Sequence, residues 1–266
     1  MLHNDIPHVL ASGQSSDQLR IGIAGWAIRR EHSARFAHVG THLQRYATLF
    51  NCVEINSCFY RPHRISTYAR WAESVPENFR FAVKLPKVIT HELRLVGVTA
   101  PLEQFLGETS GLGEKRGPIL VQLPPSFAFD SAAAGSFFDQ LRNRYDGEVV
   151  FEPRHETWFA SEVDPLLRER RVARVAADPA CVPSAAEPGG YDRIVYYRLH
   201  GSPRTYYSAY LPEVLADVAR VLDEKAVQRI TTWCIFDNTA LGAATTDALT
   251  VKSLLPNYAA RETVDR

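Results

Sequence analysis

The stretch Arg193-Ile-Val-Tyr-Tyr-Arg-Leu-His-Gly201 is a short apolar run whose end carries two polar side chains, Arg198 and His200. Successive side chains on a β-strand point to opposite faces, so residues two apart, such as this pair, share one face. The same arrangement recurs at the ends of other apolar runs, in Glu54 with Asn56, Lys84, Gln122, Glu152 with Arg154, Asp178, and Asp237 with Asn238. Several strands that each end in polar side chains are typical of the rim of an α/β barrel.

The order of the segments supports this interpretation. Eight strand-like runs are predicted at residues 19–26, 52–56, 79–84, 118–123, 148–152, 173–178, 193–200 and 230–237. Seven of them precede a segment with helical periodicity, at residues 42–50, 66–75, 101–109, 132–145, 162–171, 212–222 and 240–254, and the sixth precedes a loop at 179–190. Alternating strands and helices predict parallel pairing, and eight such units favour a single (β/α)8 TIM-type barrel with its pocket at the C-terminal rim. A doubly wound open sheet is the alternative, but neither a GxGxxG nor a GxxxxGK[ST] motif follows a strand.

Length and composition set the remaining limits. The 266 residues fit one barrel domain at 20–255, between polar tails at 1–19 and 256–266. Thirty basic and thirty acidic residues cancel, so net charge does not support binding to nucleic acid, although a local basic pocket is compatible with it. The first tail lacks the apolar core of a signal peptide, and no apolar run is long enough to span a membrane. The four cysteines have no metal-binding spacing, which is typical of a reduced, cytoplasmic protein without membrane partners.

The predicted rim gathers the candidate functional side chains. Glu54, Glu152, His200 and Asp178 are the candidate catalytic groups, because carboxylates and imidazole exchange protons near neutral pH. The candidate substrate-binding residues are Trp26, Asn56, Tyr60, Lys84, His91, Gln122, Arg154, His155, Trp158, Arg198, Asp237 and Asn238. Tyr206 and Tyr207 are further aromatic candidates for the walls of the pocket. Smaller or apolar residues on the same faces, at Ala82, Leu120, Val150, Ala176 and Ile235, would form a floor beneath these polar groups.

Three kinds of function fit this set. Lys84, Arg154 and Arg198 favour a small anionic or phosphorylated ligand, because guanidinium groups match phosphate and carboxylate geometry, and the first hypothesis is a hydrolase or lyase that uses acid–base chemistry. A metal-dependent phosphodiesterase or nuclease is the second, since carboxylates and His200 are ligand types for a divalent metal, but the three cations would oppose it. A non-catalytic module that binds a metabolite or nucleic acid is the third. Equally, the charges could pair with one another and close the rim. No cofactor is firmly implied, and the oligomeric state stays open.

Six segments carry a resemblance to a known family. They are Ile21-Gly-Ile-Ala-Gly-Trp26, Val53-Glu-Ile-Asn-Ser-Cys-Phe-Tyr-Arg61, Phe79-Arg-Phe-Ala-Val-Lys-Leu-Pro86 with Ile89-Thr-His91, Leu120-Val-Gln-Leu-Pro-Pro-Ser-Phe127, Phe151-Glu-Pro-Arg-His155 with Trp158-Phe159, and Tyr197-Arg-Leu-His-Gly201. In this order they resemble the YecE-like family, a domain of unknown function (72) with a TIM-barrel fold.

The resemblance implies a fold and a site rather than a reaction. The family pattern would include Glu54, Asn56, Tyr60, Lys84, His91, Gln122, Glu152, Arg154, His155, Trp158, Asp178, Arg198 and His200. Two positions depart from it. Pro153 stands where the family usually has an aromatic residue. In Phe236-Asp237-Asn238, Asp237 places a carboxylate where the family pattern Phe-Asn-Asn has its first Asn.

Overall fold

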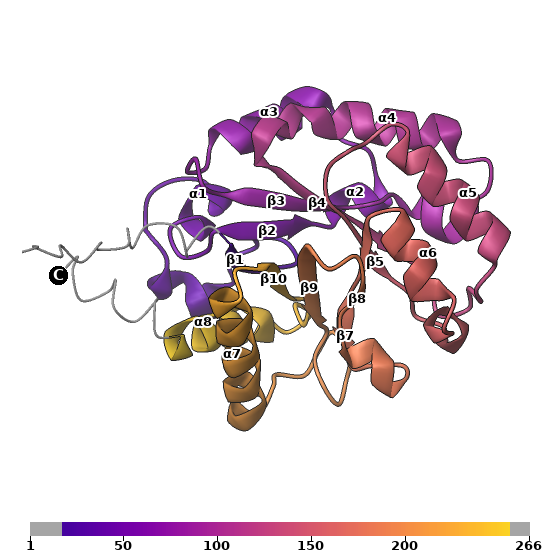
Figure 1. The fold of residues 1–266 in the computed structure, drawn as a ribbon. Helices are drawn as coiled ribbons and strands as arrows, with labels where there is room; N and C mark the ends of the chain where they lie inside the picture. Colours follow the sequence, from indigo (N-terminus) through magenta and orange to yellow (C-terminus); the bar gives the residue numbers. More distant parts are fainter. Residues whose placement is uncertain (1–17, 256–266) are drawn as a thin grey trace, which may run out of the picture.

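In the computed structural model, which describes residues 18–255, parallel strands lie at the centre of the molecule and helices surround them (Figure 1). One sheet has the order β1 (Leu19–Ile23), β10 (Thr231–Phe236), β9 (Ile194–Leu199) and β7 (Ala176–Asp178). The other has the order β2 (Cys52–Ile55), β3 (Arg80–Lys84), β4 (Arg116–Gln122), β5 (Val149–Glu152), β6 (Val172–Arg174) and β8 (Gly189–Gly190). Every pair of neighbours is parallel except β6 and β8. The predicted α/β class with parallel strands is therefore confirmed.

The helices connect successive strands. The α-helices are α1 (His42–Tyr46), α2 (Ser57–Tyr60), α3 (Ile65–Glu73), α4 (Thr99–Thr109), α5 (Ser131–Arg142), α6 (Val163–Glu169), α7 (Pro212–Val227) and α8 (Ala243–Leu254). Short 3-10 turns occupy η1 (Arg30–Arg35), η3 (Ser110–Lys115), η4 (Glu156–Phe159) and η5 (Pro183–Ala186), and η2 (Val88–Glu92) is a π-helical turn. None of the helices in the described region is long and apolar enough to cross a membrane. The predicted tails lie outside the described residues, apart from Gln18 and Leu19, and Leu19 already belongs to β1.

The two sheets meet at two places. Ala24 forms a parallel bridge with Glu54, and the Gly25 amide donates a hydrogen bond to the Glu54 carbonyl at 2.9 Å. Gly22 allows this approach, because a Cβ atom there would lie 2.8 Å from the Cys52 Sγ atom. At the other junction a single residue, Val175, separates β6 from β7. The strand pairing thus forms two sheets linked at their edges, not one continuous ladder of strand pairs.

The sixth predicted strand differs most from the structure. It is divided at Val175 into β6 and β7, and Val175 packs in the inner apolar cluster with Ala173. Because side chains alternate, Ala176 and Asp178 face the opposite side, so the prediction that Ala176 belongs to the inner floor is wrong. The predicted loop at 179–190 also contains η5 and the short strand β8. The pairs of Gly189 and Gly190 with β6 are antiparallel and involve only two residues, too few to give an alternating pattern.

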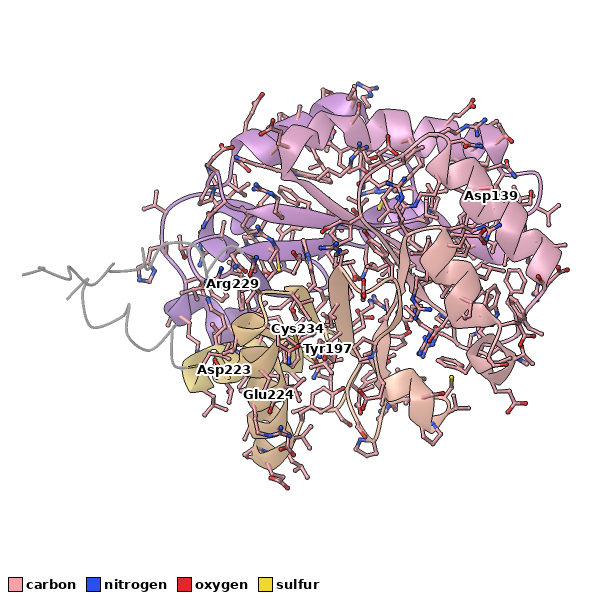
Figure 2. All side chains as sticks on the ribbon, in the orientation of Figure 1. Asp139, Tyr197, Asp223, Glu224, Arg229 and Cys234 are labelled. Atoms are coloured by element: carbon pink, nitrogen blue, oxygen red, sulfur yellow. The ribbon has the colours of Figure 1, made fainter. Side chains whose placement is uncertain are left out.

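Alternation on the other strands separates two apolar clusters. The inner cluster includes Ala82, Leu120, Val150, Ile235 and two larger aromatic residues that the predicted floor omits, Tyr196 and Trp233. Those two rings stack with their centroids 5.9 Å apart. The outer cluster fills the space between strands and helices, and Figure 2 shows Tyr197 and Cys234 close together beside α7, which carries Glu224. The strand faces that bear the inner cluster end in the predicted rim residues, apart from Asp178.

Candidate active site

Arg198 is the fully buried centre of a group of charges above the inner cluster. Its Nε and Nη2 atoms donate to the two carboxylate oxygens of Glu54, at 3.0 and 2.6 Å. Its Nη1 donates to Glu152 at 2.7 Å, and Nη2 also donates to Asp237 at 3.1 Å. Burial opposes the charge, but these three carboxylates outweigh it and raise the pKa of Arg198 well above its ordinary value. Arg198 is therefore engaged by protein carboxylates, as in the interpretation that the charges pair with one another.

His200 joins two of the same carboxylates. Its Nε2 lies 2.9 Å from Glu152 Oε1 and its Nδ1 lies 3.1 Å from Asp237 Oδ2. An ionised carboxylate accepts hydrogen bonds but cannot donate them, so the ring satisfies both contacts when both nitrogens carry hydrogen. Burial disfavours the charged ring, but Glu152 and Asp237 raise the pKa of His200 above its ordinary value of 6.5. The two contacts and the raised pKa both favour the charged form of His200 beside Arg198.

The pKa values of Glu152 and Asp237 shift in the opposite direction, downward. Burial by itself would raise their pKa values, but Arg198 and His200 hold the pKa of Glu152 well below its ordinary range and also lower that of Asp237. Tyr196 donates its hydroxyl hydrogen to Glu54 at 2.8 Å, and Gln122 donates to Glu152 at 3.1 Å. Such bonds stabilise ionised carboxylates in a buried setting. Glu152 and Asp237 are therefore held in their ionised forms within a hydrogen-bonded cluster.

We expect the stability of the fold to depend on pH through His200. A group with a higher pKa in the folded state stabilises the protein fully below its unfolded pKa, and this stabilisation is lost as pH rises through the folded value. The free energy of unfolding should therefore decline as pH rises above 6.5, the ordinary value for His200. Urea unfolding of the wild type and a His200→Gln variant, from about pH 6 to about pH 9, measures this difference.

The difference between these two proteins isolates His200 from the other histidines. The pKa values of His63 and His91 are lowered, chiefly by burial, so their contributions have the opposite sign and are common to both proteins. At low pH, the loss of stability is expected from Glu152 and Asp237. The stabilisation that they provide is lost as pH falls through their lowered pKa values. Parallel stability profiles for the wild type and His200→Gln above pH 6.5 would contradict a charged His200.

A cavity of about 450 Å3 lies at the carboxyl ends of the strands. Seven predicted site residues line it: Asn56, Tyr60, Lys84, His91, Gln122, Arg154 and Asp237. Its wall also contains Ala24, Phe59, Leu123, Pro124, Pro125, Tyr206 and Thr239. Of the three carboxylates that bind Arg198, Asp237 alone is in this lining, and its side chain is 11% exposed. The Asn56 Oδ1 atom is buried and makes no hydrogen bond within the described residues.

Two cations face the cavity. Arg154 donates from Nη1 to the Tyr206 hydroxyl at 2.8 Å, and its Nε lies 3.9 Å from Glu152. The Lys84 ammonium lies over the ring of Phe59, 4.2 Å from the centroid. When His200 is charged, the site contains three carboxylates and four cationic side chains. The carboxylates are Glu54, Glu152 and Asp237, and the cations are Arg198, His200, Lys84 and Arg154. The electrostatic balance therefore favours an anion in the cavity.

Five predicted site residues lie outside both the cavity lining and the buried charge cluster around Arg198. Trp26 packs edge-on against Trp71, with the ring centroids 5.0 Å apart. Trp158 is fully buried and donates to the Phe127 carbonyl at 2.7 Å, and the His155 side chain caps η4 by accepting from the Thr157 amide. Aromatic and histidine residues at the base of a loop have these structural uses, which sequence spacing does not distinguish from binding.

Asp178 and Asn238 are the other two. Asp178 accepts a hydrogen bond from the Tyr210 hydroxyl at 2.8 Å, on the face opposite to the inner cluster. Asn238 is buried and donates to Asp247 at 2.7 Å and to the Ser208 carbonyl at 2.9 Å. The structure therefore separates Asp178 from the Glu54, Glu152 and His200 side chains that it brings together.

Tyr196 was absent from the predicted site residues, and Tyr206 was predicted only as a further candidate for the pocket wall, where the structure places it. Tyr196 binds Glu54 from beneath, and its position two residues before Arg198 places it on the same face, which is a signal that the sequence contains. Tyr206 contacts Arg154 and lies edge-on to the His200 ring, with the centroids 5.5 Å apart. It has a left-handed backbone, with φ at 70°, in the segment between β9 and α7. Such a conformation is uncommon for a residue other than glycine and cannot be read from the sequence.

The described residues contain no group of three or more His, Cys, Asp or Glu side chains arranged to hold a metal ion. Glu54, Glu152 and Asp237 instead surround the Arg198 guanidinium.

Comparisons with known proteins identify relatives across most of the chain. A family model described as "Protein of unknown function DUF72" matches residues 20–265. The UPF0759 protein YecE of Escherichia coli strain K12 is 32% identical over 172 residues, which cover 62% of this chain and 61% of that protein. Its counterpart in Escherichia coli O157:H7 is 31% identical over the same length. The match therefore spans about three fifths of these curated relatives.

Solved structures share the fold at lower identity. A DUF72 family protein from Enterococcus faecalis V583 superposes with a TM-score of 0.75 at 21% identity, covering 89% of this chain and 95% of that one. A DUF72 family protein from Thermotoga maritima MSB8 gives a TM-score of 0.68 at 24% identity, covering 89% of this chain and 98% of that one. At these identities the similarity establishes the fold alone.

Proposed function

This chain belongs to the DUF72 family, and we propose that its cavity is the active site of an enzyme that acts on a small anionic substrate by acid–base chemistry. The observation that carries the proposal is the distribution of charge. Arg198 and His200 neutralise most of the charge of the buried carboxylates, while Lys84 and Arg154 face the cavity without a carboxylate at close hydrogen-bonding distance among residues 18–255. An entering anion would therefore meet a positive wall.

We propose that the two sheets act as one (β/α)8 barrel that positions this wall. The Ala24–Glu54 bridge and the short step through Val175 support the proposal, because they bring the sheet edges together at two junctions. Eight strand positions result when β6 and β7 are counted as one interrupted strand and the two-residue antiparallel β8 is left out. In barrels of this kind, active sites lie at the carboxyl ends of the strands, and the cavity lies at this end.

The geometry divides the work among the charged residues. Arg154 and Lys84 attract and hold the anion, and Asn56 and Gln122 orient it with their amide groups. Asp237 faces the cavity in its ionised form and is the candidate general base, with His200 behind it as a proton-donating partner. Burial and the nearby cations Lys84, Lys87 and Arg154 lower the pKa of His91, so it is a second candidate base on the wall.

Glu54, Glu152 and Arg198 serve a different purpose in this proposal. None of the three is in the cavity lining, and each is fully buried. They fix His200 and Asp237 in position and balance their charges. The cavity, at about 450 Å3, is within the range of small-molecule sites and fits a hydrolase or lyase substrate of modest size.

Replacing Arg154 by glutamine should weaken the binding of inorganic phosphate. A hydrogen bond between charged groups contributes about 1.5–3 kcal/mol, which corresponds to a roughly ten- to hundredfold increase in the dissociation constant. Isothermal titration of phosphate at constant ionic strength into the wild type and Arg154→Gln measures the change. Glutamine keeps a polar side chain of similar reach that can still contact Tyr206.

Arg144→Gln is the matched control, because Arg144 is a surface arginine that pairs with Glu103 at 3.0 Å. Its phosphate affinity should equal that of the wild type. If both variants bind phosphate equally well, Arg154 does not hold the anion. Tight binding without turnover of any member of a panel of phosphate esters and oxo acids would favour a binding module over an enzyme.

A further inference from the structure

Lys84 has an environment unlike those of the nearby lysines Lys87 and Lys115. It ends β3, is half-buried in the cavity wall, and places its Nζ over the Phe59 ring. Among residues 18–255, no carboxylate oxygen lies within 4 Å of the Lys84 Nζ atom, so Lys84 forms no ion pair there. Its Nζ also donates no hydrogen bond to a residue in this range. Lys87, three residues later, pairs with Glu92 at 3.2 Å, and Lys115 donates to two carbonyl groups at 2.9 Å.

The environment of Lys84 increases the fraction of its side chain that is present as the neutral amine. Burial lowers the pKa of Lys84 most, and the Arg198 guanidinium lowers it further. Glu54, Glu152 and Asp237 act in the opposite direction but do not restore the ordinary value, because Arg198 and His200 already engage them. Only the neutral amine of a lysine has the lone pair needed to attack carbon.

We propose that Lys84 forms an imine with the carbonyl carbon of a small anionic aldehyde or ketone whose anionic group is held by Arg154. The inference rests on the proposed function and narrows its substrate class to oxo acids and phosphorylated carbonyl compounds. It also favours a lyase, because an imine withdraws electrons from the neighbouring carbon–carbon bond.

The chemistry balances without an oxidant or a further reactant. The Nζ lone pair attacks the carbonyl carbon, a C–N bond forms, and the carbonyl oxygen takes up a proton. The nitrogen releases one of its two protons, and its lone pair then expels the oxygen as water after a second protonation. The product is the protonated imine, and the net uptake is one proton. Asp237 and His91 line the same cavity and can exchange these protons. The face of Phe59, 4.2 Å from Nζ, would stabilise the positively charged iminium form.

Two anionic aldehydes serve as probes. The full chain is incubated at neutral pH with pyridoxal 5′-phosphate or with glyoxylate, reduced with borohydride, and digested for peptide mass mapping. The chain has only five lysines, so the modified position is assigned directly. We expect several-fold more label on Lys84 than on Lys87, because burial lowers the pKa of Lys84 and Arg154 holds the anionic group of the aldehyde beside it. Preference for one aldehyde indicates whether the anionic group is a phosphate or a carboxylate.

Equal or greater labelling of Lys87 in the wild type would overturn the imine proposal, and this result needs no variant. Lys84→Arg has no primary amine at this position and should lose the cavity label, whereas Lys87→Arg should keep it. If label is absent from Lys84 but phosphate binding depends on Arg154, the imine inference fails and the proposed anion site stands. If phosphate binding is also independent of Arg154, both fail.

Discussion

Replacing Arg198 by methionine is expected to lower the free energy of unfolding by about 3–5 kcal/mol. The guanidinium group is fully buried and contacts Glu54, Glu152 and Asp237. Methionine fills much of the same space but leaves three buried carboxylates with one fewer cation, and an uncompensated buried charge is far more costly than the loss of a surface pair. Guanidinium chloride unfolding followed by circular dichroism measures the change.

A second substitution tests the physical reason. Glu54→Gln in the Arg198→Met background removes one of the charges left unpaired, so the double variant should be more stable than Arg198→Met alone. The control is Arg220→Met on α7, where the arginine is exposed and pairs with Glu224 at 2.8 Å, and no measurable change is expected. A loss below about 1 kcal/mol in Arg198→Met would mean that the cluster is not held together by this residue.

Asp237→Asn is expected to reduce kcat/KM by about a hundred- to ten-thousandfold, the usual contribution of a positioned general base. Asparagine retains an oxygen that can accept a hydrogen bond from His200, but it cannot take a proton from the substrate. The comparison uses whichever phosphate ester or oxo acid the wild type turns over in the panel. Circular dichroism of both proteins separates a loss of chemistry from a loss of folding.

Asp178→Asn provides the matched control for this second prediction. Asp178 also ends a strand, but it accepts from Tyr210 on the face opposite to the inner cluster, and asparagine can accept the same bond. Its kcat/KM should stay within a few-fold of the wild type. A large loss in Asp178→Asn, together with wild-type activity in Asp237→Asn, would reverse the roles that the structure supports.

Strand alternation explains why much of the site could be predicted from sequence. Glu54, Lys84, Gln122, Glu152 and Arg198 end regular strands and share a face with apolar residues two positions earlier, so the pattern identifies the inner face directly. The same argument assigned Asp178 to the wrong face. Ala173 and Val175 are the residues of the sixth strand that lie in the inner cluster, so alternation places Ala176 and Asp178 on the opposite face. An error of one residue in the assumed inner positions moves every side chain of a strand to the other face.

Pairing among the charged residues was the part that sequence could not determine. Arg198 has the residue type and place of an anion-binding group, but three carboxylates from different strands surround it. Which charges pair depends on distances across the inner face of the sheets, and these do not follow from the order of the residues. Trp158 and His155 show the same difficulty for loop residues, because packing and capping use the same side chains as binding.

The most direct test of the central claim is a crystal structure of the full chain soaked in selenate, a tetrahedral dianion with an anomalous signal. The account predicts an anomalous peak in the cavity, within hydrogen-bonding distance of the Arg154 guanidinium and beside the Lys84 ammonium. The peak should disappear in Arg154→Gln crystals soaked in the same way. Selenate bound at surface arginines with none in the cavity would contradict an anion site at this rim.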